Sequence, residues 1–183
     1  MSEKNISIIP YQTFYASKEN SNSPFIPEIV RAGKKLKESD IATDAIISLS
    51  YGRRILVNAE NIDIGKIRRE DLLEIVDFDP VKRVLLVMGS KESDIDAPTH
   101  WMIHHVRDEV NAVVQINDKS WAEKLEKKLP TTKEQLRGTF EFTKEVLKAL
   151  RSSKKIVIKN RGVLFVGSNM KEVEDLILET HGE

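Results

Sequence analysis

The pattern of apolar and polar residues predicts a series of short strands, several of them paired as hairpins. Gly52-Arg53 separates two apolar runs, and Asn160-Arg161-Gly162 separates two more, as is typical of tight turns between antiparallel strands. Other short apolar runs end at charged residues or at the Asp79-Pro80 break. The predicted strands are residues 45–51, 54–58, 75–78, 83–88, 111–117, 155–159 and 163–166.

Apolar residues at helical spacing predict helices between these strands. Asp96 is placed to cap the helix that begins at Pro98. Pro130 should end a second helix, over residues 119–129. The predicted helices are residues 28–36, 98–106, 119–129, 138–150 and 170–180, with a short helical turn at 69–73. Hairpins combined with scattered helices indicate an α/β domain of the α+β type with a central, largely antiparallel sheet.

The first residues differ in character from the rest, so we expect an N-terminal arm and linker over residues 1–23 and one domain over 24–183. The segment Ile6–Ile9 is apolar enough to pair as an edge strand, but Pro10 interrupts it. The stretch Ser17–Pro24 is polar, as expected for a linker.

Composition narrows the possible functions. The 183 residues include 29 Lys and Arg, 29 Asp and Glu, four His and no Cys. The absence of cysteine excludes disulfides, iron–sulfur clusters and thiol catalysis. The balanced charge argues against nucleic acid and anionic membranes as partners. No apolar run approaches the ~18 residues of a membrane span, and the first residues lack a secretory signal, so a cytoplasmic protein is expected.

Common catalytic motifs fail on inspection. His100 and His104 have the spacing of a zinc-protease helix, but Trp101 stands where the general-base glutamate should be. Residues 161–166 faintly resemble an RNA-binding strand without its stacking aromatics. Phosphate-binding glycine patterns and nucleophile elbows are also missing. These residues alone therefore define no active site.

Three stretches nevertheless resemble the class II aldolase/adducin family, which includes fuculose-phosphate aldolase. Residues 107–117 (RDEVNAVVQIN) resemble its "RPDxxAVVHxH", residues 159–167 (KNRGVLFVG) its "xNHGxxxxG", and residues 96–100 (DAPTH) its "ExxxH". The resemblance extends over about residues 27–180. It implies a layered α/β/α domain and, for the enzymes of the family, a zinc ion that polarises a sugar-phosphate carbonyl.

The metal ligands and the catalytic glutamate of that family are not retained. The positions of its three histidine ligands hold Gln115, Asn117 and Arg161. Amides are poor zinc ligands and a guanidinium cannot bind a cation, so we expect no metal cofactor. The position of the catalytic carboxylate holds Asp96, one methylene shorter than glutamate. The positions of the family's phosphate site hold Ala45-Ile46, Glu60-Asn61 and Asp94-Ile95.

The resemblance implies a ligand-binding cleft whose members are Asp96, His100, Gln115, Asn117 and Arg161. Within it we predict an ion pair between Arg161 and Asp96, direct or bridged by the two amides, in place of the metal. An arginine left free in the cleft would instead hold a small carboxylate or phosphate. Purely structural roles stay open: the amides as strand-end hydrogen-bonding groups, Asp96 as an N-cap, Arg161 as an exposed turn residue and His100 in packing.

Three functional interpretations remain open, and we favour the first. It is a non-catalytic aldolase/adducin-like domain that acts in assembly or binds a small anionic or sugar-phosphate ligand. The second is a divergent, metal-free enzyme that uses Asp96, His100 and Arg161. The third is a class II sugar-phosphate aldolase or epimerase with zinc ligands relocated among Asp94, Asp96, His100, His104 and His105. The resemblance also implies a homo-oligomer, with the tetramer as the family's common form.

Overall fold

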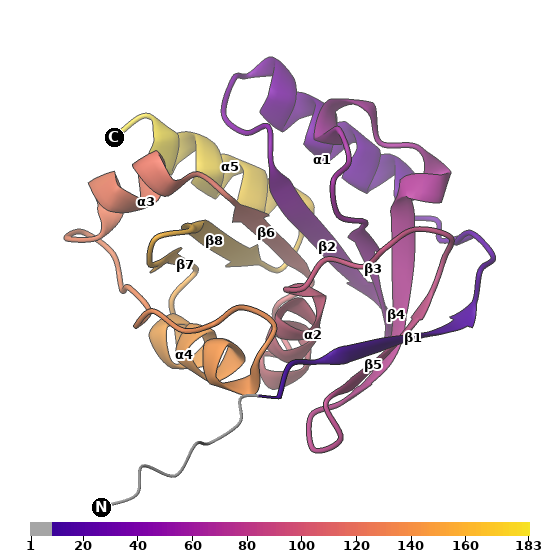
Figure 1. Ribbon diagram of the computed structural model, residues 1–183. Helices are drawn as coiled ribbons and strands as arrows, with labels where there is room; N and C mark the ends of the chain where they lie inside the picture. The colour runs from indigo at the N-terminus through magenta and orange to yellow at the C-terminus, as the bar shows by residue number, and fades with distance from the viewer. Residues whose placement is uncertain (1–8) are drawn as a thin grey trace, which may run out of the picture.

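The computed structural model describes residues 9–183 as an eight-stranded sheet with helices on both faces (Figure 1). Its strands are β1 (Gln12–Ser17), β2 (Ala45–Tyr51), β3 (Arg54–Asn58), β4 (Leu72–Asp79), β5 (Val84–Met88), β6 (Ala112–Ile116), β7 (Lys155–Ile158) and β8 (Gly162–Gly167). Its helices are α1 (Ile26–Glu38), α2 (Ala97–Val106), α3 (Lys119–Leu125), α4 (Phe140–Leu150) and α5 (Met170–His181), with short 3₁₀ turns η1 (Ile64–Lys66) and η2 (Arg69–Asp71). Over this described part, no helix is both long and apolar enough to cross a membrane.

The strands lie in the order β1-β5-β4-β3-β2-β6-β8-β7. Every neighbouring pair is antiparallel except β1 and β5, which run parallel. Both predicted hairpins are present, β2 with β3 and β7 with β8. The prediction of an α/β domain with a largely antiparallel sheet is therefore confirmed.

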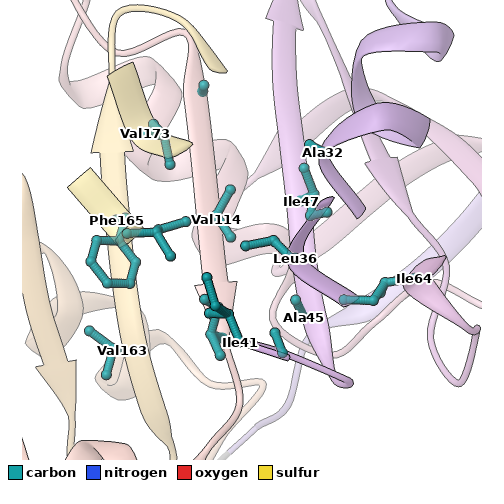
Figure 2. Close-up of a cluster of buried hydrophobic side chains, with 14 of the residues drawn as sticks. Ala32, Leu36, Ile41, Ala45, Ile47, Ile64, Val114, Val163, Phe165 and Val173 are labelled. Carbon is teal, nitrogen blue, oxygen red and sulfur yellow. The ribbon is translucent and has the colours of Figure 1, made fainter. Parts of the chain in front are cut away.

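Helices α1, α3 and α5 cover one face of the sheet (Figure 1). Figure 2 shows the resulting core, in which Leu36 of α1 and Val173 of α5 approach Ile47, Val114 and Phe165 from three neighbouring strands. All five side chains are buried. Burial of large aliphatic and aromatic side chains contributes about 1.5–3 kcal/mol each, so this layer fixes the central strands.

Helices α2 and α4 cover the opposite face (Figure 1). Because side chains alternate along a strand, Ile47 faces α1 while Ile46 and Ser48 face the other side. In the same way Gln115 of β6 points toward α2. The layered α/β/α arrangement thus places Ser48 and Gln115 of the sheet against α2, where the site described below is formed.

The chain before α1 is in part joined to the sheet. Strand β1 pairs with β5 over the register Gln12–Val84 to Ser17–Met88. Ser21 is buried and its hydroxyl donates to Glu74 of β4 at 2.5 Å. The predicted strand segment Ile6–Ile9 lies outside the described residues except for its last member.

Candidate functional site

An ion pair between a buried carboxylate and a partly exposed arginine lies at the start of α2. Asp96 has no exposed surface, and its Oδ2 accepts hydrogen bonds from Arg137 Nη2 at 2.7 Å and from Arg137 Nε at 3.0 Å. Arg137 Nη2 also lies 3.3 Å from Asp94 Oδ1. A buried carboxylate needs such compensation, because removing its partner would leave an uncompensated charge out of water. Asp96 does occupy the N-cap position, but its side chain caps no helix N–H.

The two amides at the end of β6 extend this network. Gln115 is fully buried and its Nε2 donates to Asp96 Oδ2 at 2.9 Å and to Asn117 Oδ1 at 3.1 Å. Asn117 Nδ2 in turn donates to Asp44 Oδ1 at 3.2 Å. The side chains of Gln115 and Asn117 therefore act here as hydrogen-bonding groups that connect carboxylates.

Two histidines of α2 extend the network between this helix and the sheet. His100 Nε2 lies 3.3 Å from Gln115 Oε1, and His100 Nδ1 lies 2.8 Å from the Ser48 hydroxyl. The same hydroxyl lies 2.9 Å from His104 Nε2, and His104 Nδ1 lies 3.3 Å from the Val110 carbonyl. Since the Gln115 amide nitrogen donates to a carboxylate, its oxygen must accept from His100 Nε2–H.

With this assignment, the network has one hydrogen fewer than it has contacts. Four contacts join Gln115, His100, Ser48, His104 and the Val110 carbonyl, but a hydroxyl and two neutral imidazoles supply only three hydrogens. Burial nevertheless holds both imidazoles neutral, because it lowers the pKa of His100 to about 4 and that of His104 to about 3. The network stays one proton short at neutral pH.

A cavity of about 450 Å³ opens beside the ion pair. Its wall consists of residues 43–45 and 58–62, Asp94, Ile95, Arg137 and Arg161. Most of the positions that the family resemblance assigned to a phosphate site, among them Ala45, Glu60 and Asp94, thus line the same cavity. A neighbouring cavity of about 440 Å³ is lined in part by Asp44 and Asn117.

Arg161 reaches this cavity from the turn between β7 and β8. Its backbone N–H donates to the Ile158 carbonyl at 3.0 Å, and Asn160 before it adopts φ 58°. The side chain forms no hydrogen bond and no ion pair with any residue of the described part of the chain, although its Nε is buried. Burial raises the pKa of the Asp94 carboxyl, and the positive charges of Arg137 and Arg161 oppose this rise.

The predicted ion pair between Arg161 and Asp96 is wrong. Arg137 takes that place, and Gln115 connects Asp96 to Asn117 and not to Arg161. Of the five residues predicted for the cleft, only Arg161 lines the 450 Å³ cavity, while Asp96, His100 and Gln115 are buried and do not line it. Sequence reasoning missed Arg137 because it lies in a loop without periodicity, 41 positions from Asp96.

The residues at the three metal positions do not fit zinc. Gln115 and Asn117 offer amides that are already hydrogen-bonded to carboxylates, and Arg161 offers a cation. Over residues 9–183, no three His, Asp or Glu side chains form a group that could hold a metal ion. No chemical step can be derived through a metal at these positions.

Comparison with solved structures identifies the fold. No protein-family model matches the sequence, and no curated protein sequence matches it. An L-fuculose 1-phosphate aldolase superposes with a TM-score of 0.75 and 18% identity, covering 88% of this chain and 84% of that chain. The L-fuculose-1-phosphate aldolase from Thermus thermophilus gives a TM-score of 0.63 and 18% identity, covering 85% of each chain.

A third similar structure is a single domain. The N-terminal class II aldolase domain of a conserved protein from Thermoplasma acidophilum gives a TM-score of 0.62 and 13% identity, covering 90% of this chain and 95% of that domain. The chain therefore has the class II aldolase fold, as the sequence resemblance implied. At these identities the likeness establishes the fold alone, so function must be argued from the site.

Proposed function

We propose that this chain is a non-catalytic, metal-independent binding domain with the class II aldolase fold. Its ligand is a small molecule with an anionic group, phosphate or carboxylate, held in the 450 Å³ cavity by Arg161. A cavity of this size is within the usual range for small-molecule sites.

The observation that carries the proposal is the state of the Arg161 side chain. It lines the cavity, its Nε is buried, and it has no hydrogen-bonding or ionic partner in residues 9–183. A guanidinium offers five N–H donors that match phosphate and carboxylate oxygens. A ligand anion would satisfy these donors.

The surroundings of Asp96 support a role without catalysis. The family resemblance places Asp96 at the position of the catalytic carboxylate, which makes it the candidate catalytic residue. A general base must reach the proton that it removes. Asp96 has no exposed surface, and its oxygens accept from Arg137 and Gln115. These contacts favour a structural role for this carboxylate.

The experiment is a thermal-unfolding titration with inorganic phosphate at constant ionic strength. A ligand at about ten times its Kd stabilises the native state by about 1.4 kcal/mol, which raises the midpoint of a domain of this size by about 4 °C. We expect this rise for the wild type and for Arg53→Met, which removes an exposed turn arginine outside the cavity. Arg161→Met should abolish it while leaving the midpoint without phosphate nearly unchanged.

A phosphate effect that survives in Arg161→Met would contradict the proposal. The divergent sugar-phosphate aldolase remains the alternative, and it is tested separately by incubating the protein with L-fuculose 1-phosphate, the substrate in the name of the similar structures. Release of an aldehyde at a rate dependent on Asp96 would favour that alternative over a binding domain.

A further inference from the structure

The cavity wall carries charges of both signs. Arg137 and Arg161 stand against Asp44, Glu60 and Asp94. Arg137 is already engaged by Asp94 and by the buried Asp96. This ion-paired group carries one positive and two negative charges. Among the described residues that line the cavity, the remaining charged side chains are Arg161, Asp44 and Glu60, and these are left to face a ligand.

These two carboxylates have no cationic partner in the described part of the chain. Asp44 accepts one hydrogen bond, from Asn117 Nδ2 to Oδ1 at 3.2 Å, and no ion pair reaches it within 4.0 Å. The Glu60 side chain forms no hydrogen bond or ion pair with residues 9–183, while its backbone N–H donates to the Glu92 carbonyl at 3.1 Å. Both carboxylates therefore remain available to a ligand cation.

An anion bound at Arg161 would share the cavity with these two negative charges. Like charges that line one cavity repel each other, and the repulsion is stronger beside a protein wall than in bulk water. A ligand that carries a cationic group as well as an anionic group removes this repulsion and adds an attraction. The wall thus fits a molecule with both charges better than it fits a simple anion.

We infer that the ligand of this cavity is a small zwitterion, with a phosphate or carboxylate at Arg161 and an ammonium group at Asp44 or Glu60. This inference rests on the proposed function, because it assumes that Arg161 holds the anionic group. It adds the chemical class of the ligand: an amino phosphate or amino acid of a size that fits about 450 Å³.

The test compares two probes of nearly equal shape, 2-aminoethyl phosphate and 2-hydroxyethyl phosphate, by titration calorimetry at pH 7. They differ in one group, an ammonium or a hydroxyl. Partly exposed ion pairs change affinity by about threefold each, so two carboxylates together should favour the amino probe by about tenfold. Glu60→Gln and Asp44→Asn should each reduce this preference, and the double variant should abolish it.

Glu179→Gln is the matched control, since Glu179 is an exposed carboxylate of α5 that does not line the cavity. Equal affinity for the two probes, with binding of both lost in Arg161→Met, would overturn the zwitterion and leave the proposed function standing. A preference that persists in the double variant would overturn the assignment to Asp44 and Glu60. If neither 2-aminoethyl phosphate nor 2-hydroxyethyl phosphate binds, both the zwitterion and the proposed function are overturned.

Discussion

Arg137 makes Asp96 a buried, compensated charge and keeps Arg161 available. Had Arg161 paired with Asp96, no arginine of the cavity wall would be left without a partner among residues 9–183. Instead Arg137 holds Asp94 and Asp96 together, with Nη2 at 3.3 Å and 2.7 Å from their oxygens. An arginine from a loop 41 positions from Asp96 thus balances part of the charge of these two carboxylates.

The buried histidines predict how stability depends on pH. The pKa of His100 is about 4 and that of His104 about 3, both below the unfolded value near 6.5. Between pH 6.5 and 4 the unfolded chain thus binds protons that the folded chain does not. Stability is greatest above pH 6.5, and it should fall on acidification by on the order of 1 kcal/mol per pH unit for each histidine.

Urea unfolding at pH 7, 6 and 5 measures this slope. His104→Gln should reduce it by about half, because one of the two titrating groups is gone. His105→Gln is the control, since His105 is exposed and stacks on Trp101 with ring centroids 3.4 Å apart. An unchanged slope in His104→Gln would show that these imidazoles are not the groups that titrate.

At the scale of elements, the β7–β8 hairpin carries Arg161 to the cavity, and Gly162 permits its approach to β6. A Cβ added at Gly162 would lie 1.9 Å from the Ile116 carbonyl oxygen, a backbone atom that cannot move without disturbing the sheet. We expect Gly162→Ala to cost about 2–3 kcal/mol and to reduce the phosphate effect, because the turn that holds Arg161 must shift.

Gly52 in the other hairpin provides the comparison. It adopts φ 58° but has open space where a Cβ would be added. Gly52→Ala should therefore cost only about 1 kcal/mol from backbone strain and leave the phosphate effect intact. Chemical unfolding of both variants measures the difference, and a smaller cost at Gly162 than at Gly52 would refute the steric argument.

Local patterns were sufficient for most elements but not for the contacts of the site. The hairpins follow from alternation and turn residues, as at Gly52-Arg53, and the helices follow from apolar spacing. Helix α3 ends at Leu125, four residues before the predicted end, with a turn after it. Strand β1 was not predicted, since Gln12–Ser17 is largely exposed and pairs with a strand about 70 positions later.

The contacts within the predicted cleft could be anticipated only in part. The resemblance brought Asp96, Gln115 and Asn117 together, and their hydrogen bonds agree with that grouping. It could not indicate that Arg137 would reach Asp96, because this depends on how the loop before α4 folds. At Gly138 of that loop, φ is 73° and a Cβ would meet Ile95 at 2.4 Å, so the loop lies close against the segment that carries Asp94 and Asp96.

For the molecule as a whole, the class II aldolase fold is present while the positions of its metal ligands offer two amides and a guanidinium. Affinity for zinc depends on imidazole, thiolate or carboxylate donors, and the chain has no cysteine. Within residues 9–183 the four histidines belong to no group of three potential metal ligands. His100 and His104 share the buried Ser48 hydroxyl, His105 stacks on Trp101, and His181 lies against Trp121. The predicted homo-oligomer stays a prediction, which light scattering at micromolar concentration would test.

We therefore expect the untagged protein to contain far less than one zinc per chain when purified without chelators, as measured by plasma mass spectrometry. Treatment with EDTA should leave the thermal midpoint unchanged, because a metal bound only to the native state would raise it by mass action. Stoichiometric zinc whose removal lowers the midpoint would contradict this expectation. Such zinc would favour the aldolase with ligands relocated among Asp94, Asp96 and the α2 histidines, and Asp94→Asn should then reduce the zinc content, whereas Glu179→Gln should not.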